Sequence, residues 1–272
     1  MLQKQQKSFN MKRTVNTIKS FKGKEKISVL TAYDYATALI VDDSDIDMIL
    51  VGDSLAMTMM GLDSTLPVTM EIMLHHTKCV TRAVQNALVV ADMPFMSYHV
   101  SIEQAITNAG RFLQEADADA VKIEGGAIRA ETIKKLTEND IPVLAHIGLT
   151  PQSVKAMGFK VQGRRSEDAL ELIQDAIAVQ DSGAFALVLE CVPAELAKDI
   201  SEELSIPTIG IGAGVHCDGQ VLVYHDMLGM YPKLTPKFIK KYDEIGEKMK
   251  KAFKEYSKEV KTGKFPEDKH SF

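Results

Sequence analysis

Residues 120–145 read AVKIEGGAIRAETIKKLTENDIPVLA, and this segment contains one complete strand–helix–strand unit. The short, mostly apolar runs at 120–123 and 142–145 are typical of strands that are buried on both faces. Between them, residues 128–139 carry apolar side chains three and four positions apart, which predicts an amphipathic helix. This order predicts two neighbouring parallel strands that are joined by a crossover helix.

The same unit recurs along the chain. The eight runs expected as strands are Ile27–Thr31, Met48–Val51, Ala87–Ala91, Ala120–Ile123, Pro142–Ala145, Ala186–Leu189, Pro207–Ile211 and Gln220–Tyr224. Helical patterns separate most of them, and eight strands alternating with helices predict a single-domain (β/α)8 TIM barrel. Such barrels often have about 250 residues, which suits a chain of 272. A doubly wound open sheet is the alternative, but the runs show no division into two halves.

The composition is that of an ordinary globular protein. Hydrophobic residues make up 45% and charged residues 25%, which excludes collagen-like, disordered and disulfide-stabilised classes. No apolar run approaches the roughly 18 residues of a membrane span, and residues 1–10 lack the apolar core of a signal peptide. The three cysteines are odd in number and lack metal-type spacing. We therefore expect a cytoplasmic protein with no membrane partner.

The net charge of −5 is unevenly distributed. Residues 1–26 carry eight basic residues and one acid, residues 233–272 carry twelve and seven, and residues 27–232 carry 12 and 29. This acidic body argues against a nucleic-acid partner, because a nucleic-acid groove needs a contiguous basic face. We expect an N-terminal extension over 1–26 that forms a cap or an oligomer contact, a barrel over 27–232, and a C-terminal tail over 233–272. The spacing of apolar residues predicts an amphipathic helix over 236–261 in that tail.

Acidic residues follow four of the predicted strands. Asp53, Asp92, Glu124 and Glu190 each lie one or two residues beyond an apolar run. Because a barrel gathers the carboxyl ends of its strands at one mouth, these acids should converge. Carboxylates held together repel, so some must protonate or bind a cation, and an all-oxygen set favours Mg²⁺ over Zn²⁺. Alternatively, some of them cap helices or pair with Lys122, which projects to the same side of its strand as Glu124.

Three further features have less specific patterns. His146 follows the predicted strand at 142–145 and is a possible supporting residue of the same site. The glycine-rich run at 209–214 either packs tightly near the site or binds a phosphate, and tight packing is favoured. Cys191 has no His beside it in the local sequence, so we interpret it as a packed cysteine rather than a nucleophile.

Ten ordered segments resemble those of the ketopantoate hydroxymethyltransferase family. They are LTAYD (30–34), LVGDS (50–54), DSTLPVT (63–69), ADMPF (91–95), VKIEGG (121–126), HIGLTPQ (146–152), VQGR (161–164), LECVP (189–193), IGIGAG (209–214) and HSF (270–272). The resemblance extends from about residue 12 to the end of the chain. Ala56 and the pair His99-Val100 depart from the family pattern, which puts loop shape in doubt but not the matched acids.

The resemblance implies a (β/α)8 barrel enzyme that transfers a hydroxymethyl group from 5,10-methylenetetrahydrofolate to 3-methyl-2-oxobutanoate. The product is 2-dehydropantoate (ketopantoate), of the pantothenate and coenzyme A pathway. It also implies one Mg²⁺ per subunit and a homo-oligomer, typically a decamer. By motif, Glu190 resembles the proton acceptor, and Asp53, Asp92 and Glu124 resemble the metal ligands. The positions that resemble oxo-acid contacts are Asp53, Ser54, Asp92 and Lys122.

The chemistry of a 2-oxo acid is consistent with this set of residues. Its ketone and carboxylate oxygens can chelate a cation, which then stabilises the enolate that forms when C3 loses its proton to Glu190. One alternative is a Mg²⁺-dependent C–C lyase of the isocitrate lyase type, although the Lys-Lys-Cys-Gly-His-like loop of those enzymes is absent from the sequence. The other is a non-catalytic ligand-binding barrel, which has no use for unneutralised carboxylates at its mouth.

Overall fold

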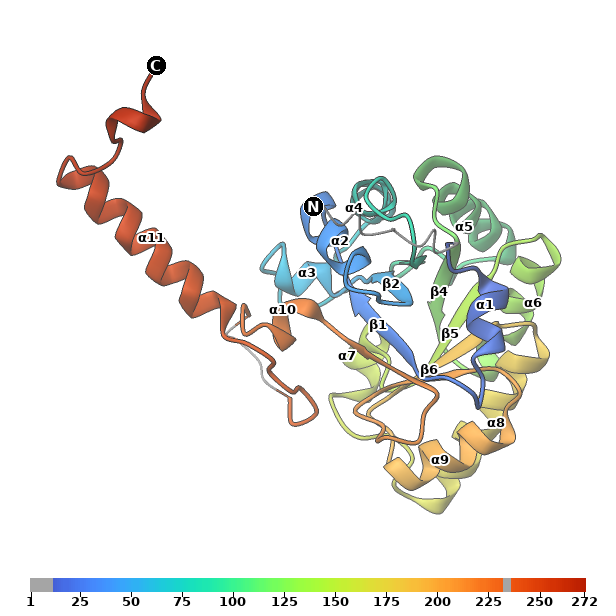
Figure 1. Cartoon of the computed structure of the whole chain (residues 1–272). Coiled ribbons are helices and arrows are strands. Elements are labelled where there is room, and N and C mark those ends of the chain that lie inside the picture. Colours follow the sequence, from blue (N-terminus) through green and yellow to red (C-terminus); the bar gives the residue numbers. More distant parts are fainter. Residues whose placement is uncertain (1–11, 232–235) are drawn as a thin grey trace, which may run out of the picture. The chain divides into compact units, whose positions relative to one another are not determined.

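The computed structural model describes residues 12–231 and 236–272, and its central feature is a closed barrel of parallel strands (Figure 1). The strands are β1 (Ile27–Thr31), β2 (Met48–Val51), β3 (Leu88–Asp92), β4 (Ala120–Glu124), β5 (Val143–Gly148), β6 (Ala186–Glu190), β7 (Thr208–Ile211) and β8 (Gly219–Leu222). Each strand pairs with the next, and β8 returns to β1 with Gly219 opposite Ile27. The predicted (β/α)8 barrel is therefore confirmed, and the open sheet is excluded.

Helices follow most of the strands and surround the barrel (Figure 1). They are α1 (Val15–Ser20), α2 (Tyr35–Asp42), α3 (Leu55–Thr58), α4 (Met70–Thr81), α5 (Ile102–Ala116), α6 (Ala130–Glu138), α7 (Val154–Met157), α8 (Ser166–Asp181) and α9 (Ala194–Glu203). Two short 3-10 helices, η1 (Ala127–Arg129) and η2 (Pro151–Ser153), precede α6 and α7. No helix of the described ranges combines the length and the apolar character that a bilayer crossing requires.

Local sequence sets the starts of the helices. Thr69 and Ser101 precede α4 and α5, and each hydroxyl accepts a hydrogen bond from the backbone N–H three residues further along, at Ile72 and Gln104. These bonds satisfy donors that the first helical turn leaves without an acceptor. The buried positions of α5 recur at three- and four-residue steps over 105–116, so this face packs inward.

The described part of the N-terminal extension closes the barrel at the end where the strands begin. Ile18 of α1 is fully buried and belongs to the apolar cluster that fills the barrel. Three ion pairs join the segment to acids directly preceding strands, with N–O distances of 2.7, 3.2 and 2.9 Å: Lys12–Asp119, Arg13–Asp47 and Lys22–Asp218. The basic charge of this segment thus partly neutralises acids of the barrel. The extension over 1–26 as a whole, as a cap or an oligomer contact, stays a prediction.

The observed strands differ from the predicted ones at their ends. Asp92, Glu124 and Glu190 are the last residues of β3, β4 and β6 and do not follow them. A residue whose polar side chain points into the barrel mouth can still form backbone hydrogen bonds with the neighbouring strand. These strands therefore continue one residue beyond the apolar runs. The prediction that the last strand reaches Tyr224 is wrong, because β8 ends at Leu222 and Tyr224 begins the short helix α10 (Tyr224–Met227).

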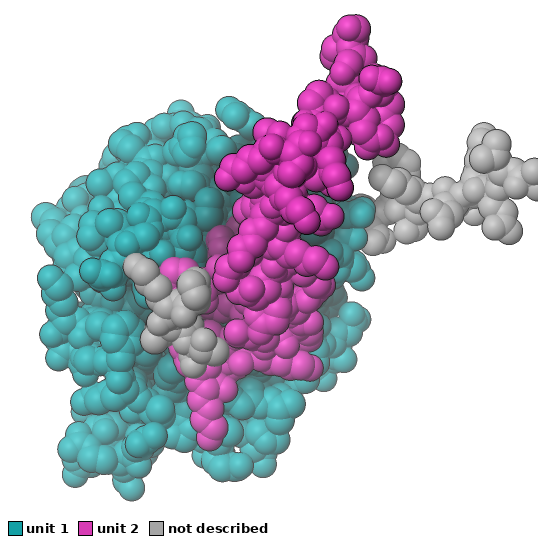
Figure 2. Space-filling view, turned by 90° about the vertical axis from the view of Figure 1, so that its left-hand side faces the viewer, with its two compact units in different colours: residues 1–222 teal, residues 223–272 magenta. Residues whose placement is uncertain are grey.

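The chain divides into two compact units, residues 1–222 and 223–272, which Figure 2 shows in different colours. The second unit contains α10, the long helix α11 (Ile245–Lys261) and the 3-10 helix η3 (Asp268–His270). The predicted helix start at residue 236 is wrong. The backbone N–H groups of Tyr242 and Ile245 donate to Met227 and Leu228, at 2.7 and 2.8 Å, and not to the preceding turn of a helix. The expected boundary at residue 26 stays a prediction, and the one at 232 lies outside the described residues.

Candidate active site

Four acidic side chains meet where the strands end. Asp92, Glu124 and Glu190 close three strands of the barrel, and Asp53 lies two residues beyond β2. Asp53, Asp92 and Glu124 are at most 5% exposed. Burial of this much acid requires compensation by hydrogen bonds, by protons or by a positive charge.

Lys122 supplies a positive charge from within the barrel. Its amino group lies 2.5 Å from Asp92 Oδ1 and 3.7 Å from Glu124 Oε1. Burial disfavours the charge on Lys122, but the carboxylates of Asp92, Glu124 and Asp53 outweigh it and raise the pKa of the lysine above its ordinary value. Lys122 therefore projects to the same side as Glu124, as expected, and pairs with two of the acids.

Asp53 is held by two neighbours. Its backbone N–H donates to Asp92 Oδ2 at 3.0 Å, and its own Oδ2 accepts a hydrogen bond from Gln152 Nε2 at 2.9 Å. Burial and the nearby Asp92 carboxylate raise the pKa of Asp53 to about 7, against the opposing effects of Lys122 and Gln152. With a pKa of about 7, Asp53 is partly protonated at neutral pH, and a cation bound nearby would favour its ionised form.

Ser54 follows Asp53 and precedes α3. Its side chain makes no capping bond to that helix, and its hydroxyl lies 2.8 Å from the Tyr33 hydroxyl. Because Ser54 directly follows Asp53 in the chain, it lies beside the acidic cluster. Its hydroxyl can donate a hydrogen bond to a bound anion.

His146 lies between two of the acids. Its Nε2 is 3.3 Å from Glu190 Oε2, and its Nδ1 is 3.7 Å from Glu124 Oε1. Burial and the Lys122 cation keep the pKa of His146 well below its ordinary value, so the imidazole is neutral near pH 7. Burial also raises the pKa of Glu190 to about 8. Gly148 allows β5 and β6 to approach here, because a Cβ at its φ of +92° would lie 2.3 Å from the Glu190 carbonyl oxygen.

The carboxylates have the donor chemistry of a site for a hard divalent cation. Glu124 Oε1 is buried and accepts no hydrogen bond from the described residues. Over residues 12–231 and 236–272, no three His, Cys, Asp or Glu side chains already surround one point. Mg²⁺, however, usually binds one or two carboxylates and completes its shell with water and substrate oxygens. Asp53, Asp92 and Glu124 are the carboxylates from which such an open site could draw its protein ligands.

Two residues of this cluster were not predicted from the sequence. Gln152 and Tyr98 are 4% and 2% exposed. The Tyr98 hydroxyl donates to Gln152 Oε1 at 2.7 Å and accepts from the Glu124 backbone N–H at 3.1 Å. Gln152 stands in the HIGLTPQ segment that carries part of the family resemblance, which was the available signal. Nothing in the local pattern around Tyr98 distinguishes it from an ordinary core aromatic residue.

The structure also bears on two weaker expectations. In the glycine-rich run, a Cβ on Gly214 (φ +84°) would lie 2.5 Å from the Cβ of Ala194, so tight packing explains this glycine. Cys191 is half-buried, and burial together with Glu190 raises the pKa of its thiol to about 11. A thiol that stays protonated is a poor nucleophile, which agrees with the interpretation as a packed cysteine.

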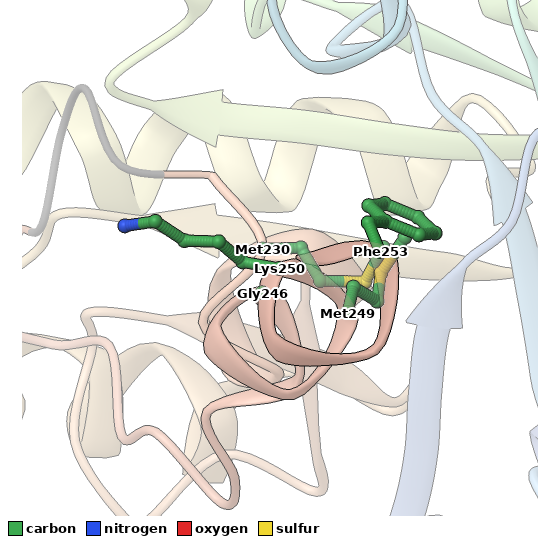
Figure 3. A pocket seen from close by; sticks show the side chains of 5 residues that line it. All are labelled: Met230, Gly246, Met249, Lys250 and Phe253. Carbon is green, nitrogen blue, oxygen red and sulfur yellow. The ribbon is translucent and has the colours of Figure 1, made fainter. Parts of the chain in front are cut away.

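A shallow hollow of about 300 Å³ lies within the second unit (Figure 3). Its lining residues are Met230, Gly246, Met249, Lys250 and Phe253. Figure 3 shows Met249 and Phe253 close together while the Lys250 side chain extends away from them. This hollow contains no acid, so it is not part of the acidic cluster.

Comparisons with known proteins agree on one family. The pattern of the family described as ketopantoate hydroxymethyltransferase matches residues 12–268. A protein of Clostridium botulinum (strain Loch Maree / Type A3) named 3-methyl-2-oxobutanoate hydroxymethyltransferase is 58% identical over 264 residues, which cover 96% of each chain. A protein of the same name from Syntrophus aciditrophicus (strain SB) is 56% identical over 261 residues, 95% of this chain and 96% of the relative.

Solved structures resemble this chain in fold. A phosphoenolpyruvate phosphomutase from Streptomyces platensis subsp. rosaceus superposes with a TM-score of 0.62 at 14% identity, over 92% of this chain and 88% of the other. A 2,3-dimethylmalate lyase of the PEP mutase/isocitrate lyase superfamily gives a TM-score of 0.59 at 14% identity, over 96% and 93%. At this level of identity the similarities show a shared barrel fold, and they carry no conclusion about activity. The near-complete family match and the identity of 58% show that this chain belongs to the ketopantoate hydroxymethyltransferase family.

Proposed function

We propose that this chain transfers a hydroxymethyl group from 5,10-methylenetetrahydrofolate to 3-methyl-2-oxobutanoate, giving 2-dehydropantoate for pantothenate and coenzyme A biosynthesis. The observation that carries the proposal is the 58% identity over 264 residues to a relative named for this activity. The buried acids around Lys122 support it, because the reaction needs a base and a means to stabilise developing negative charge.

Asp53, Asp92 and Glu124 would hold one Mg²⁺ per subunit. Bound there, the ion would withdraw electron density from the ketone oxygen of the oxo acid and make its C3 proton more acidic. Lys122 would neutralise the substrate carboxylate, and the Ser54 hydroxyl would donate to it. Asp53 and Asp92 would also line the oxo-acid site, since they lie beside the lysine that binds the acid.

Glu190 would take the proton from C3 of the substrate. Its pKa of about 8 makes it a far stronger base than an exposed carboxylate and still leaves part of it ionised near pH 7. The methylene carbon of the folate is bonded to two nitrogens. The C3 electron pair would form a bond to this carbon as one carbon–nitrogen bond breaks, and water would supply the hydroxyl group as the second breaks. The two nitrogens would take up the proton held by Glu190 and one proton from the water, which leaves tetrahydrofolate. The neutral His146 would support Glu190 by limiting the positions of its carboxyl group.

The direct test is deuterium uptake at C3 of 3-methyl-2-oxobutanoate in D₂O, followed by NMR without folate. Exchange with Mg²⁺ that EDTA abolishes, together with product once methylenetetrahydrofolate is added, is the expected result. Asp92→Ala should remove both the exchange and its dependence on Mg²⁺. Absence of exchange and of folate-dependent product would favour a non-catalytic barrel, whereas cleavage of the substrate's carbon skeleton would favour a lyase.

We also propose that the protein is cytoplasmic and forms a homo-oligomer, a decamer by the family resemblance. Light scattering on the protein eluting from a size-exclusion column should give the mass of ten chains. A mass of one chain over a wide range of concentrations would contradict this.

A further inference from the structure

Gln152 contacts two acids that come from different strands. It is the second residue of η2, directly after Pro151. Its side-chain Nε2 donates to Asp53 Oδ2 at 2.9 Å, while its backbone N–H donates to Glu124 Oε2 at 3.0 Å. The backbone donor is available because the first N–H groups of a helix have no acceptor within it. One residue of the loop after β5 therefore holds the carboxylates that follow β2 and end β4.

The contacts of Gln152 require an amide. Nε2 also donates to the Met93 carbonyl oxygen at 3.0 Å, so two acceptors face its two hydrogens. Oε1 accepts a hydrogen bond from the Tyr98 hydroxyl at 2.7 Å. A carboxylate at this position would set oxygen against oxygen at both Asp53 and Met93, and an apolar side chain would leave buried polar groups without partners.

Tyr98 fixes which end of the amide faces Asp53. Its hydroxyl accepts from the Glu124 backbone N–H at 3.1 Å and therefore has its own hydrogen to donate toward Gln152 Oε1. Both side chains are nine-tenths or more buried, so water does not compete for these bonds. The amide cannot turn over without losing hydrogen bonds at both of its ends.

We propose that Gln152 is a positioning residue of the cation site and that Tyr98 holds it in place. This inference rests on the proposed function. Gln152 binds one oxygen of Asp53 and one of Glu124, and the other oxygen of each carboxylate lies outside these bonds. When a residue already holds the ligand carboxylates in one orientation, less conformational entropy is lost as the cation binds, so the cation binds more tightly. Changes at such residues reduce metal affinity by about 10- to 100-fold.

The test measures Mn²⁺ binding by EPR on the whole protein without substrates, because Mn²⁺ shares the preference of Mg²⁺ for oxygen ligands. Gln152→Met keeps the backbone N–H but removes the amide, and we expect the Kd for Mn²⁺ to rise by about 10- to 100-fold. Tyr98→Phe keeps the buried ring and removes only the hydroxyl, so it should give a smaller rise in the same direction. The matched control is Gln114→Met on the exposed face of α5, which should leave the Kd unchanged.

Two results would overturn the inference in distinguishable ways. If Gln152→Met or, should that variant not fold, Tyr98→Phe binds Mn²⁺ as tightly as the wild-type protein, Gln152 does not position the site and the proposed function is untouched. If the wild-type protein itself does not bind Mn²⁺, the metal site of the proposed function fails and this inference fails with it.

Discussion

His146 Nε2 lies 3.3 Å from Glu190 Oε2 in the interior of the barrel mouth. The imidazole is neutral because burial and Lys122 hold its pKa well below the ordinary value, so the pair is not an ion pair. Glu190 consequently has no cationic partner in this neighbour, and burial raises its pKa to about 8. This environment suits a carboxylate that must accept a proton from carbon.

Replacement of Glu190 by glutamine should abolish most of the activity. Glu190→Gln keeps the size and hydrogen-bonding capacity of the side chain but cannot accept a proton. We expect kcat to fall by about 10²- to 10⁴-fold, with binding of 3-methyl-2-oxobutanoate by calorimetry largely unchanged. Glu195→Gln on α9, an exposed position, is the control. Wild-type turnover in Glu190→Gln would refute the assignment of the base.

The same substitution should change how stability depends on pH. The pKa of Glu190 is raised from 4.5 to about 8 in the folded protein, so between these values the folded state retains a proton that the unfolded state releases. Stability therefore falls as pH rises through this window. Glu190→Gln removes this loss. The free energy of unfolding of the variant minus that of the wild type should therefore be about 1–3 kcal/mol larger at pH 8.5 than at pH 4.5. Urea titrations in EDTA at the two pH values measure this, and an equal difference at both would contradict it.

Lys122→Met should destabilise the metal-free protein. The substitution removes the cation that lies 2.5 Å from Asp92 and leaves several carboxyl groups buried without a positive charge. Loss of one partner of a buried ion pair typically costs about 3–5 kcal/mol, and urea unfolding at neutral pH should show a loss of this size. The same change at the exposed Lys155 of α7 should have little effect. Equal stability of the two variants would mean that the acids do not depend on Lys122.

Ile18→Ala tests the cap of the barrel. Ile18 is fully buried in the apolar cluster inside the strands, so its truncation should leave a cavity and lower the free energy of unfolding by about 2–5 kcal/mol. Because the cap lies at the end of the barrel opposite the acids, kcat at 25 °C should stay within about twofold of the wild-type value. Thermal unfolding and steady-state kinetics check both parts. A large loss of kcat without loss of stability would contradict this separation of roles.

Local patterns were sufficient to predict the barrel and its acidic mouth. Strands buried on both faces must be apolar throughout, so each appears as a short apolar run, and the first acid beyond the run falls at the mouth. Asp92, Glu124 and Glu190 follow this rule and end their strands. The start of α11 could not be predicted from local spacing. The helical spacing of apolar residues continues through residues 236–244, but the Tyr242 N–H there bonds to the Met227 carbonyl oxygen and not to a preceding helical turn.

Contacts between distant residues were decided by the tertiary structure alone. Gln152 bonds to Asp53, 99 residues away, and Tyr98 bonds to Gln152 across 54 residues. Such pairs depend on strand register and on closure of the barrel, which no short window of sequence contains. The charge states follow the same rule, because the neutrality of His146 comes from burial and from Lys122, and the high pKa of Glu190 comes from burial. The sequence alone thus established the order of strands and the kinds of side chain at the mouth, whereas the folded barrel decided which of them touch and which carry charge.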